Sequence, residues 1–112
     1  MYAYEIPNLR FSLPAGADIA RHRLITVNEN CEGIQATAGA TVIGASMNEA
    51  KTGEVLELAD GIVMVTTGGE VAPGAKVSAD AEGKAVTASD GYVAGVAITG
   101  GNAGELISVK VN

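Results

Sequence analysis

Large side chains are scarce in this sequence, and their scarcity limits the core that the chain can build. Its 112 residues include no Trp, one Phe and three Tyr, against 15 Gly. Because small side chains remove little apolar area from water, each of them contributes little to stability. A chain of this length forms one domain. We therefore expect a thin core, with a contribution to stability from partner subunits.

Side chains that catalyse reactions or bind metals are also few. Cys31 is the only cysteine and His22 the only histidine, which excludes an intrachain disulfide and leaves too few donors for a zinc site. Neither a Gly-x-Ser-x-Gly motif nor a Gly-Lys-Ser/Thr motif occurs, so the signatures of serine hydrolases and phosphate-binding loops are missing. We expect no enzymatic activity, no metal site and no cofactor.

Positive charge is low along most of the chain. The formal net charge is −6, and an acidic surface disfavours nucleic-acid binding. The basic cluster 21–23 is too short to change this and is typical of a solvated turn or a local salt bridge. The sequence contains neither a signal peptide nor an apolar run of the ~18 residues that span a membrane. We expect synthesis in a cytoplasm-like compartment and no membrane partner.

An internal repeat is the clearest positive feature. Two apolar, β-branched segments each carry a central glycine, and each is followed by a short loop and a Gly-Glu pair. Gly44 matches Gly95, and Gly53 matches Gly104, both at a separation of 51 residues. A glycine inside a strand indicates a bulge, a barrel corner or the close approach of another backbone. We interpret these four as structural glycines, with Gly44 and Gly95 at barrel corners.

The similarity continues toward the N-terminal end of each copy. Residues 25–33 resemble residues 75–83 at a separation of 50, which requires one inserted residue further along the chain. Each copy then reads as a hairpin, a loop, a glycine-centred strand, a second loop and a Gly-Glu strand. We expect one β-domain over residues 15–112, with repeat halves at about 24–58 and 74–109.

Short strands separated by turn residues predict an all-β fold. Between the copies, residues 61–66 are rich in β-branched side chains, and the preceding Asp60-Gly61 pair is a turn signal. We expect a small β-barrel or β-tulip with an internal pseudo-two-fold duplication. At most one short helix is expected, near residues 17–22, with Asp18 as its N-cap.

Residues 1–14 stand outside the expected repeat and read as an extended N-terminal arm. Apolar and polar residues alternate here, as in a strand, and Pro7 and Pro14 limit backbone pairing. Two alternatives remain open. The arm is either an edge strand of the same barrel or a segment that lies on a neighbouring chain by strand addition.

Taken together, the order and spacing of these motifs resemble the small capsid decoration, or cement, proteins of tailed bacteriophages. One departure is the Gly-Ala-Ser that follows Ile43, where Gly-Val-Ala is the commoner form. The resemblance covers roughly residues 13–111 and rests on the segments 14–19, 23–27, 42–45, 53–55, 61–65, 71–86, 93–97 and 104–109.

This resemblance implies a non-enzymatic protein that binds the major capsid protein on the outer surface of the virion. It further implies a homotrimer that braces the capsid against internal DNA pressure. We expect the arm to supply the capsid or intersubunit contacts, and its deletion, over residues 1–12, to leave a folded domain that no longer binds capsids. The expected contact residues are Tyr2, Tyr4, Ile6, Leu9, Arg10, Phe11 and Leu13.

A binding module on a virion surface is the alternative function. A small β-barrel that binds carbohydrate needs exposed aromatic rings for stacking on sugars. Beyond the arm, Tyr92 is the only tyrosine and no other aromatic residue occurs. The sequence therefore favours the capsid protein over a carbohydrate- or peptide-binding module.

Overall fold

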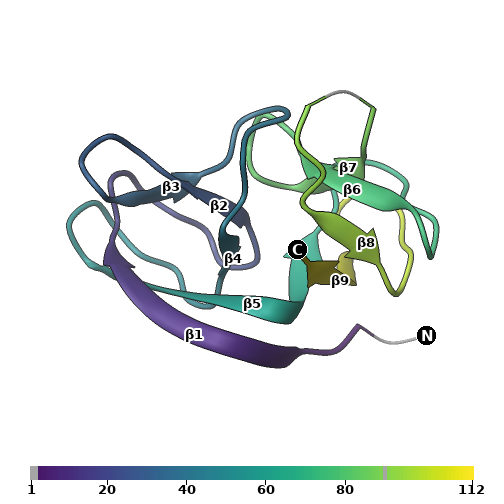
Figure 1. The fold of residues 1–112 in the computed structure, drawn as a ribbon, viewed down its shortest axis with the longest axis horizontal. Helices are drawn as coiled ribbons and strands as arrows, with labels where there is room; N and C mark the ends of the chain where they lie inside the picture. Colours follow the sequence, from purple (N-terminus) through teal and green to yellow (C-terminus); the bar gives the residue numbers. More distant parts are fainter. Residues whose placement is uncertain (1–2, 90) are drawn as a thin grey trace.

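The computed structural model describes residues 3–89 and 91–112 and confirms the all-β fold. One antiparallel sheet curls into a half-barrel, with strand order β3-β2-β4-β5-β9-β8-β6-β7 and with β1 paired to β5 (Figure 1). The strands of the described residues are β1 (Ile6–Pro14), β2 (Leu24–Val27), β3 (Gly33–Gln35), β4 (Gly44–Ser46), β5 (Val55–Thr66), β6 (Lys76–Ala79), β7 (Ala85–Thr87), β8 (Gly95–Ala97) and β9 (Leu106–Val111).

The short helix considered near residues 17–22 is absent. Ile19 instead forms an antiparallel bridge with Ala50, because each donates its N–H to the carbonyl of the other, at 2.7 and 3.1 Å. A single helical turn fixes several residues for one hydrogen bond and is unfavourable alone. Two bonds to a neighbouring loop satisfy the same backbone groups, so no helical turn forms here.

The Asp60-Gly61 pair does not end a strand, contrary to the sequence interpretation. β5 runs without interruption through Gly61, which has a φ of +88°, and the opposing register of β1 shifts between Pro7 and Arg10. The chain therefore bends here instead of reversing. A side chain at Gly61 would lie 2.6 Å from the Asn8 nitrogen, so the bulge requires a glycine.

The repeat is visible in the strand registers. Ser46 of β4 lies opposite Leu58 of β5, and Ala97 of β8 lies opposite Val109 of β9. Each residue of the second pair comes 51 positions after its counterpart in the first pair. The hairpins repeat as well, but at a separation of 52 residues rather than 50. Asn28 and Asp80 show this directly, because the side-chain oxygen of each accepts two backbone N–H groups of its own turn.

The repeated hydrogen bonds also reach further than the sequence indicated. The backbone N–H of Ala15 donates to the carbonyl of Glu54, and the backbone N–H of Thr67 donates to the carbonyl of Glu105 in the same way. The strand pairs correspond as well. The pairing of β1 with the first half of β5 is matched by the pairing of the second half of β5 with β9. We therefore describe residues 10–59 as the first copy and residues 62–111 as the second copy. β1 is an edge strand of its own sheet, which is the first of the two alternatives for the arm.

The Gly-Glu pairs have the same function in both copies. Gly53 and Gly104 have φ values of +86° and +88°. The following carboxylates then accept a backbone N–H from the loop, Glu54 from Lys51 at 2.7 Å and Glu105 from Asn102 at 2.6 Å. Each pair thus closes a tight turn before a long strand.

Two hydrophobic clusters form the core. The smaller one lies within the first copy and contains Leu56 and Leu58, with Phe11 and Leu13 of β1 packed against it. The larger one combines the inner face of the second copy with the outer face of the first. Most of its members are Ala or Val, as the composition indicated, so close backbone packing replaces large side chains.

Gly44 and Gly95 lie where two backbones approach each other. A Cβ on Gly44 would lie 2.7 Å from the Ala59 carbonyl oxygen, and one on Gly95 would overlap the Lys110 carbonyl. Of the three sequence interpretations, the structure therefore shows close approach of another strand.

We expect Gly95→Val to destabilise the protein by about 1–3 kcal/mol, because the added carbons must displace the β9 backbone. Gly69→Ala is the matched control, since nothing lies within 4 Å of its Cβ position and its φ is not positive. Urea unfolding of both variants measures the difference. Equal stability of the two variants would contradict the close approach.

Candidate docking surface

In the described part of the chain, ionisable groups do not gather into a metal-binding cluster. Among residues 3–89 and 91–112, no group of three or more His, Cys, Asp or Glu side chains is placed to hold a metal ion. The Cys31 thiol is free and exposed. No helix of the described chain is long and apolar enough to cross a membrane.

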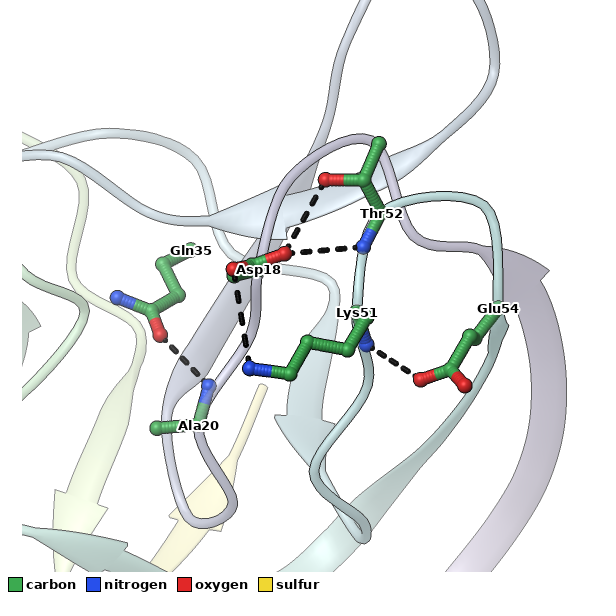
Figure 2. Close-up of polar contacts among 6 residues, drawn as sticks. All are labelled: Asp18, Ala20, Gln35, Lys51, Thr52 and Glu54. Carbon is green, nitrogen blue, oxygen red and sulfur yellow. Dashed lines mark hydrogen bonds and ion pairs between the residues drawn. The ribbon is translucent and has the colours of Figure 1, made fainter.

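A polar network fixes two loops of the first copy to each other. Figure 2 shows the Asp18 carboxylate accepting hydrogen bonds from the Thr52 N–H at 3.1 Å and the Thr52 hydroxyl at 3.2 Å. The Lys51 ammonium lies 3.9 Å from the same carboxylate. The two hydrogen bonds from Thr52 lower the pKa of Asp18, and Lys51 adds to this effect. Asp18 therefore joins its own loop to the loop that contains Thr52.

The equivalent loops of the second copy lack this network. Ala72, Pro73, Ile98 and Gly100 line an open groove of about 520 Å³, compared with about 280 Å³ for the groove at the loops of the first copy. Glu70 is the only ionisable residue that lines the larger groove. Its wall is otherwise apolar side chains, backbone, Thr99 and Asn102, which offers no acid–base pair for catalysis.

The expected contact residues fall into two groups on β1 and the segment before it. Ile6 and Leu9 are 60% and 56% exposed, and Tyr4 is 38% exposed. Phe11 and Leu13 instead pack against the smaller core cluster. Arg10 is exposed and forms an ion pair with Glu57. Tyr2 lies outside the described residues.

Local structure holds the exposed group in place. The Ser108 hydroxyl accepts the Tyr4 N–H at 2.6 Å and donates to the Tyr4 carbonyl at 2.7 Å. At the bulge, the Leu9 N–H donates to the Asp60 carboxylate at 2.8 Å. Tyr4, Ile6 and Leu9 are therefore presented by a fixed backbone and not by a loose tail, and we call these three residues the arm patch.

A second set of residues continues from the arm patch across the same face of the sheet. Strand registers place Ile6 beside Ile62, Ile62 beside Lys110, Lys110 beside Val96, and Val96 beside Lys76. Residues directly opposite in neighbouring strands share a face. We call Lys76, Val96 and Lys110 the lysine row. Sequence reasoning missed this row because its members come from three strands far apart in the chain.

Comparison with known proteins identifies the family. A family model described as phage cement protein matches residues 5–112. The chain belongs to the phage cement protein family. Members are structural, non-enzymatic proteins, and the family supports a structural capsid protein located on the virion.

A solved structure shows the same fold. It is the crystal structure of the head fiber gp8.5 N base in bacteriophage phi29, with a TM-score of 0.78 and 17% sequence identity, and the match covers 93% of each chain. No curated protein is similar enough in sequence to match. At this identity the likeness concerns the fold alone, and it agrees with the half-barrel described above.

His22 gives a test of how this family member responds to acid. Burial lowers the pKa of His22, and Arg21 adds to the effect, whereas Glu5 and a hydrogen bond to the Met64 carbonyl act in the opposite direction. Because the pKa of His22 is lower in the folded state, the unfolded chain binds a proton more readily. The free energy of unfolding therefore decreases as the pH is lowered through 6.5, the ordinary pKa of His.

We expect the free energy of unfolding to fall between pH 7.5 and pH 5.5, a window around the ordinary His pKa of about 6.5. His22→Asn should reduce that fall, because Asn cannot take up the proton and tolerates the positive φ of 63° at this position. Urea titrations across this range measure both proteins. Identical pH dependence would show that His22 does not couple to folding.

Proposed function

We propose that this protein is a cement protein that binds the outer surface of a tailed-phage capsid through the arm patch. Its partner is the major capsid protein, and its role is to brace the lattice against internal DNA pressure. The observation that carries the proposal is an exposed apolar group, Tyr4, Ile6 and Leu9, on a strand whose backbone is held by Ser108 and Asp60. Preorganised apolar groups of this kind bind without a large cost of ordering.

Charge supports this assignment. The chain carries 7 basic and 13 acidic residues, so it is repelled by DNA and does not compete for the packaged genome. Family membership supports a capsid partner. We further propose a homotrimer on the capsid, in line with the expectation from the family resemblance.

The size of the expected effect follows from burial. Removing an aliphatic side chain such as Ile or Leu from water contributes about 1.5–3 kcal/mol, and about 1.4 kcal/mol is tenfold in affinity. A capsid contact centred on Ile6 and Leu9 therefore loses most of its affinity when either becomes charged.

We expect Ile6→Asp and Leu9→Asp each to weaken binding to expanded capsids at least tenfold while the domain stays folded. Val55→Asp is the matched control, because Val55 is an even more exposed apolar residue, 67%, and lies on β5 opposite Pro14, away from the arm patch. Co-pelleting with capsids measures binding, and genome release on heating measures bracing. Unchanged binding by both arm variants would refute the proposal.

Point substitutions are preferable to removal of the arm. Deleting residues 1–12 would also remove Phe11 from the smaller core cluster and strip the paired edge from β5. The deletion would then lower stability as well as binding, and its effect on binding alone could not be measured.

A further inference from the structure

Two of the four lysines lie on one face of the second copy without an acidic partner. Lys51 and Lys84 each form an ion pair with a carboxylate of this chain, at 3.9 and 3.7 Å. Lys76 and Lys110, in the lysine row, form no ion pair with another of the described residues. β6, β8 and β9 contain no Asp or Glu. The face is therefore locally basic in a chain whose formal net charge is −6.

The lysine row points away from the core. Val77 follows Lys76 and Val109 precedes Lys110, and both valines are fully buried. Successive side chains of a strand point to opposite faces, so the two lysines and Val96 share the open face. The strands that carry them, β6, β8 and β9, are neighbours in the sheet (Figure 1). Because neighbouring strands lie about 4.8 Å apart, the backbones of the two lysines are about 10 Å apart, with Val96 between them.

The lysine row and the arm patch form one continuous surface. Ile62 lies between Ile6 and Lys110 in the strand registers. Tyr4 lies against the same face, since its backbone N–H and its carbonyl both bond to the hydroxyl of Ser108. Ser108 comes two residues before Lys110, and residues two apart on a strand share a face. A partner that covers the arm patch therefore lies beside the lysines.

The equivalent row of the first copy is a contact surface. Leu24, Ala45 and Ala59 have no exposed surface, and they belong to the large core cluster that is shared with the second copy. They have the same registers as the lysine row. The corresponding residues are Leu24 and Lys76, Ala45 and Val96, and Ala59 and Lys110. Charge at two of the three positions suits the open row to a polar partner and not to an apolar core.

An acidic protein surface is the partner that this row fits best. Nucleic acid is a continuous polyanion, and the acidic remainder of this chain repels it. Two lysines about 10 Å apart on a largely apolar face instead match separate carboxylates on a protein. Complementary charges of this kind steer two surfaces together and fix their relative orientation.

We propose that the lysine row docks on an acidic patch of the major capsid protein, beside the site that the arm patch covers. The proposal rests on the capsid role described above and adds the chemistry of the partner surface. The arm patch supplies apolar burial, and the lysine row supplies the charge that orients the contact. The capsid patch carries carboxylates about 10 Å apart around an apolar centre that meets Val96.

Association kinetics with expanded capsids that lack this protein test the role of charge. We expect Lys76→Glu combined with Lys110→Glu to associate about tenfold more slowly at about 50 mM salt, because charge at the edge of a contact acts mainly on the association rate. The wild-type rate should fall as salt rises to about 300 mM, since salt shortens the range of charge interactions. The variant should lose that dependence. Lys51→Glu combined with Lys84→Glu is the matched control, with the same net charge and both lysines outside the row.

Crosslinking of decorated capsids is the second measurement. A carbodiimide joins a lysine amine to a carboxylate with which it is in direct contact. We expect it to link Lys76 or Lys110 to an Asp or Glu of the capsid protein, and mass spectrometry of the digested particles identifies the linked residues. Capsid links that involve only Lys51 or Lys84 would overturn the proposal. Links from the lysine row to another copy of this chain alone would overturn it as well.

The arm variants separate this proposal from the capsid role itself. If Ile6→Asp loses binding while the row variant keeps the wild-type rate and salt dependence, the lysine proposal is wrong and the capsid role stands. If the row variant associates slowly and Ile6→Asp binds normally, the lysine row is confirmed as a capsid contact and the arm patch is not one. Normal binding by both variants would refute both proposals.

Discussion

The bend of β5 at Gly61 is the constraint on which the rest of the structure depends. β5 belongs to both copies, and its two faces belong to different cores. Leu56 and Leu58 on one face lie in the smaller cluster, whereas Ala59, Val63 and Val65 on the other lie in the larger one. The long strand thereby lets a sheet of small residues bury both of its faces. Any side chain at position 61 would strain a positive φ and press on β1.

Backbone proximity substitutes for side-chain volume in this fold. The large cluster is built mainly of Ala and Val, whose individual burial contributes little, yet tight packing recovers dispersion energy along whole strands. Gly44 and Gly95 permit that approach at equivalent places. Such a core tolerates little added volume, so the chain accommodates sequence change mainly on its outward positions. These are the positions where Lys76 and Lys110 replace Leu24 and Ala59.

The sequence was sufficient to predict the all-β class and the duplication, because repeated glycines impose a repeated geometry. It was insufficient for the alignment of the hairpins, since Cys31 occupies a left-handed position that Gly83 fills in the other copy. The equivalence of β1 with the second half of β5 was also hidden, because the two segments share only apolar alternation. Asp60-Gly61 signals a turn or a bulge equally well, and only the pairing of β1 distinguishes them. The lysine row depends on registers between distant strands, and no local pattern encodes these.

The free edge of β1 is poorly suited to pairing with a further strand. Among the described residues, β1 pairs only with β5, so its far edge is unpaired. At the equivalent edge of the second copy, the Thr66 N–H donates to the His22 carbonyl at 3.0 Å. β1 has Pro14 at that position, which has no N–H to donate, and Pro7 removes another donor. Prolines on an edge strand block pairing with a further strand. The edge therefore offers fewer donors to another backbone, and the side chains of Ile6 and Leu9 are the exposed apolar groups along it.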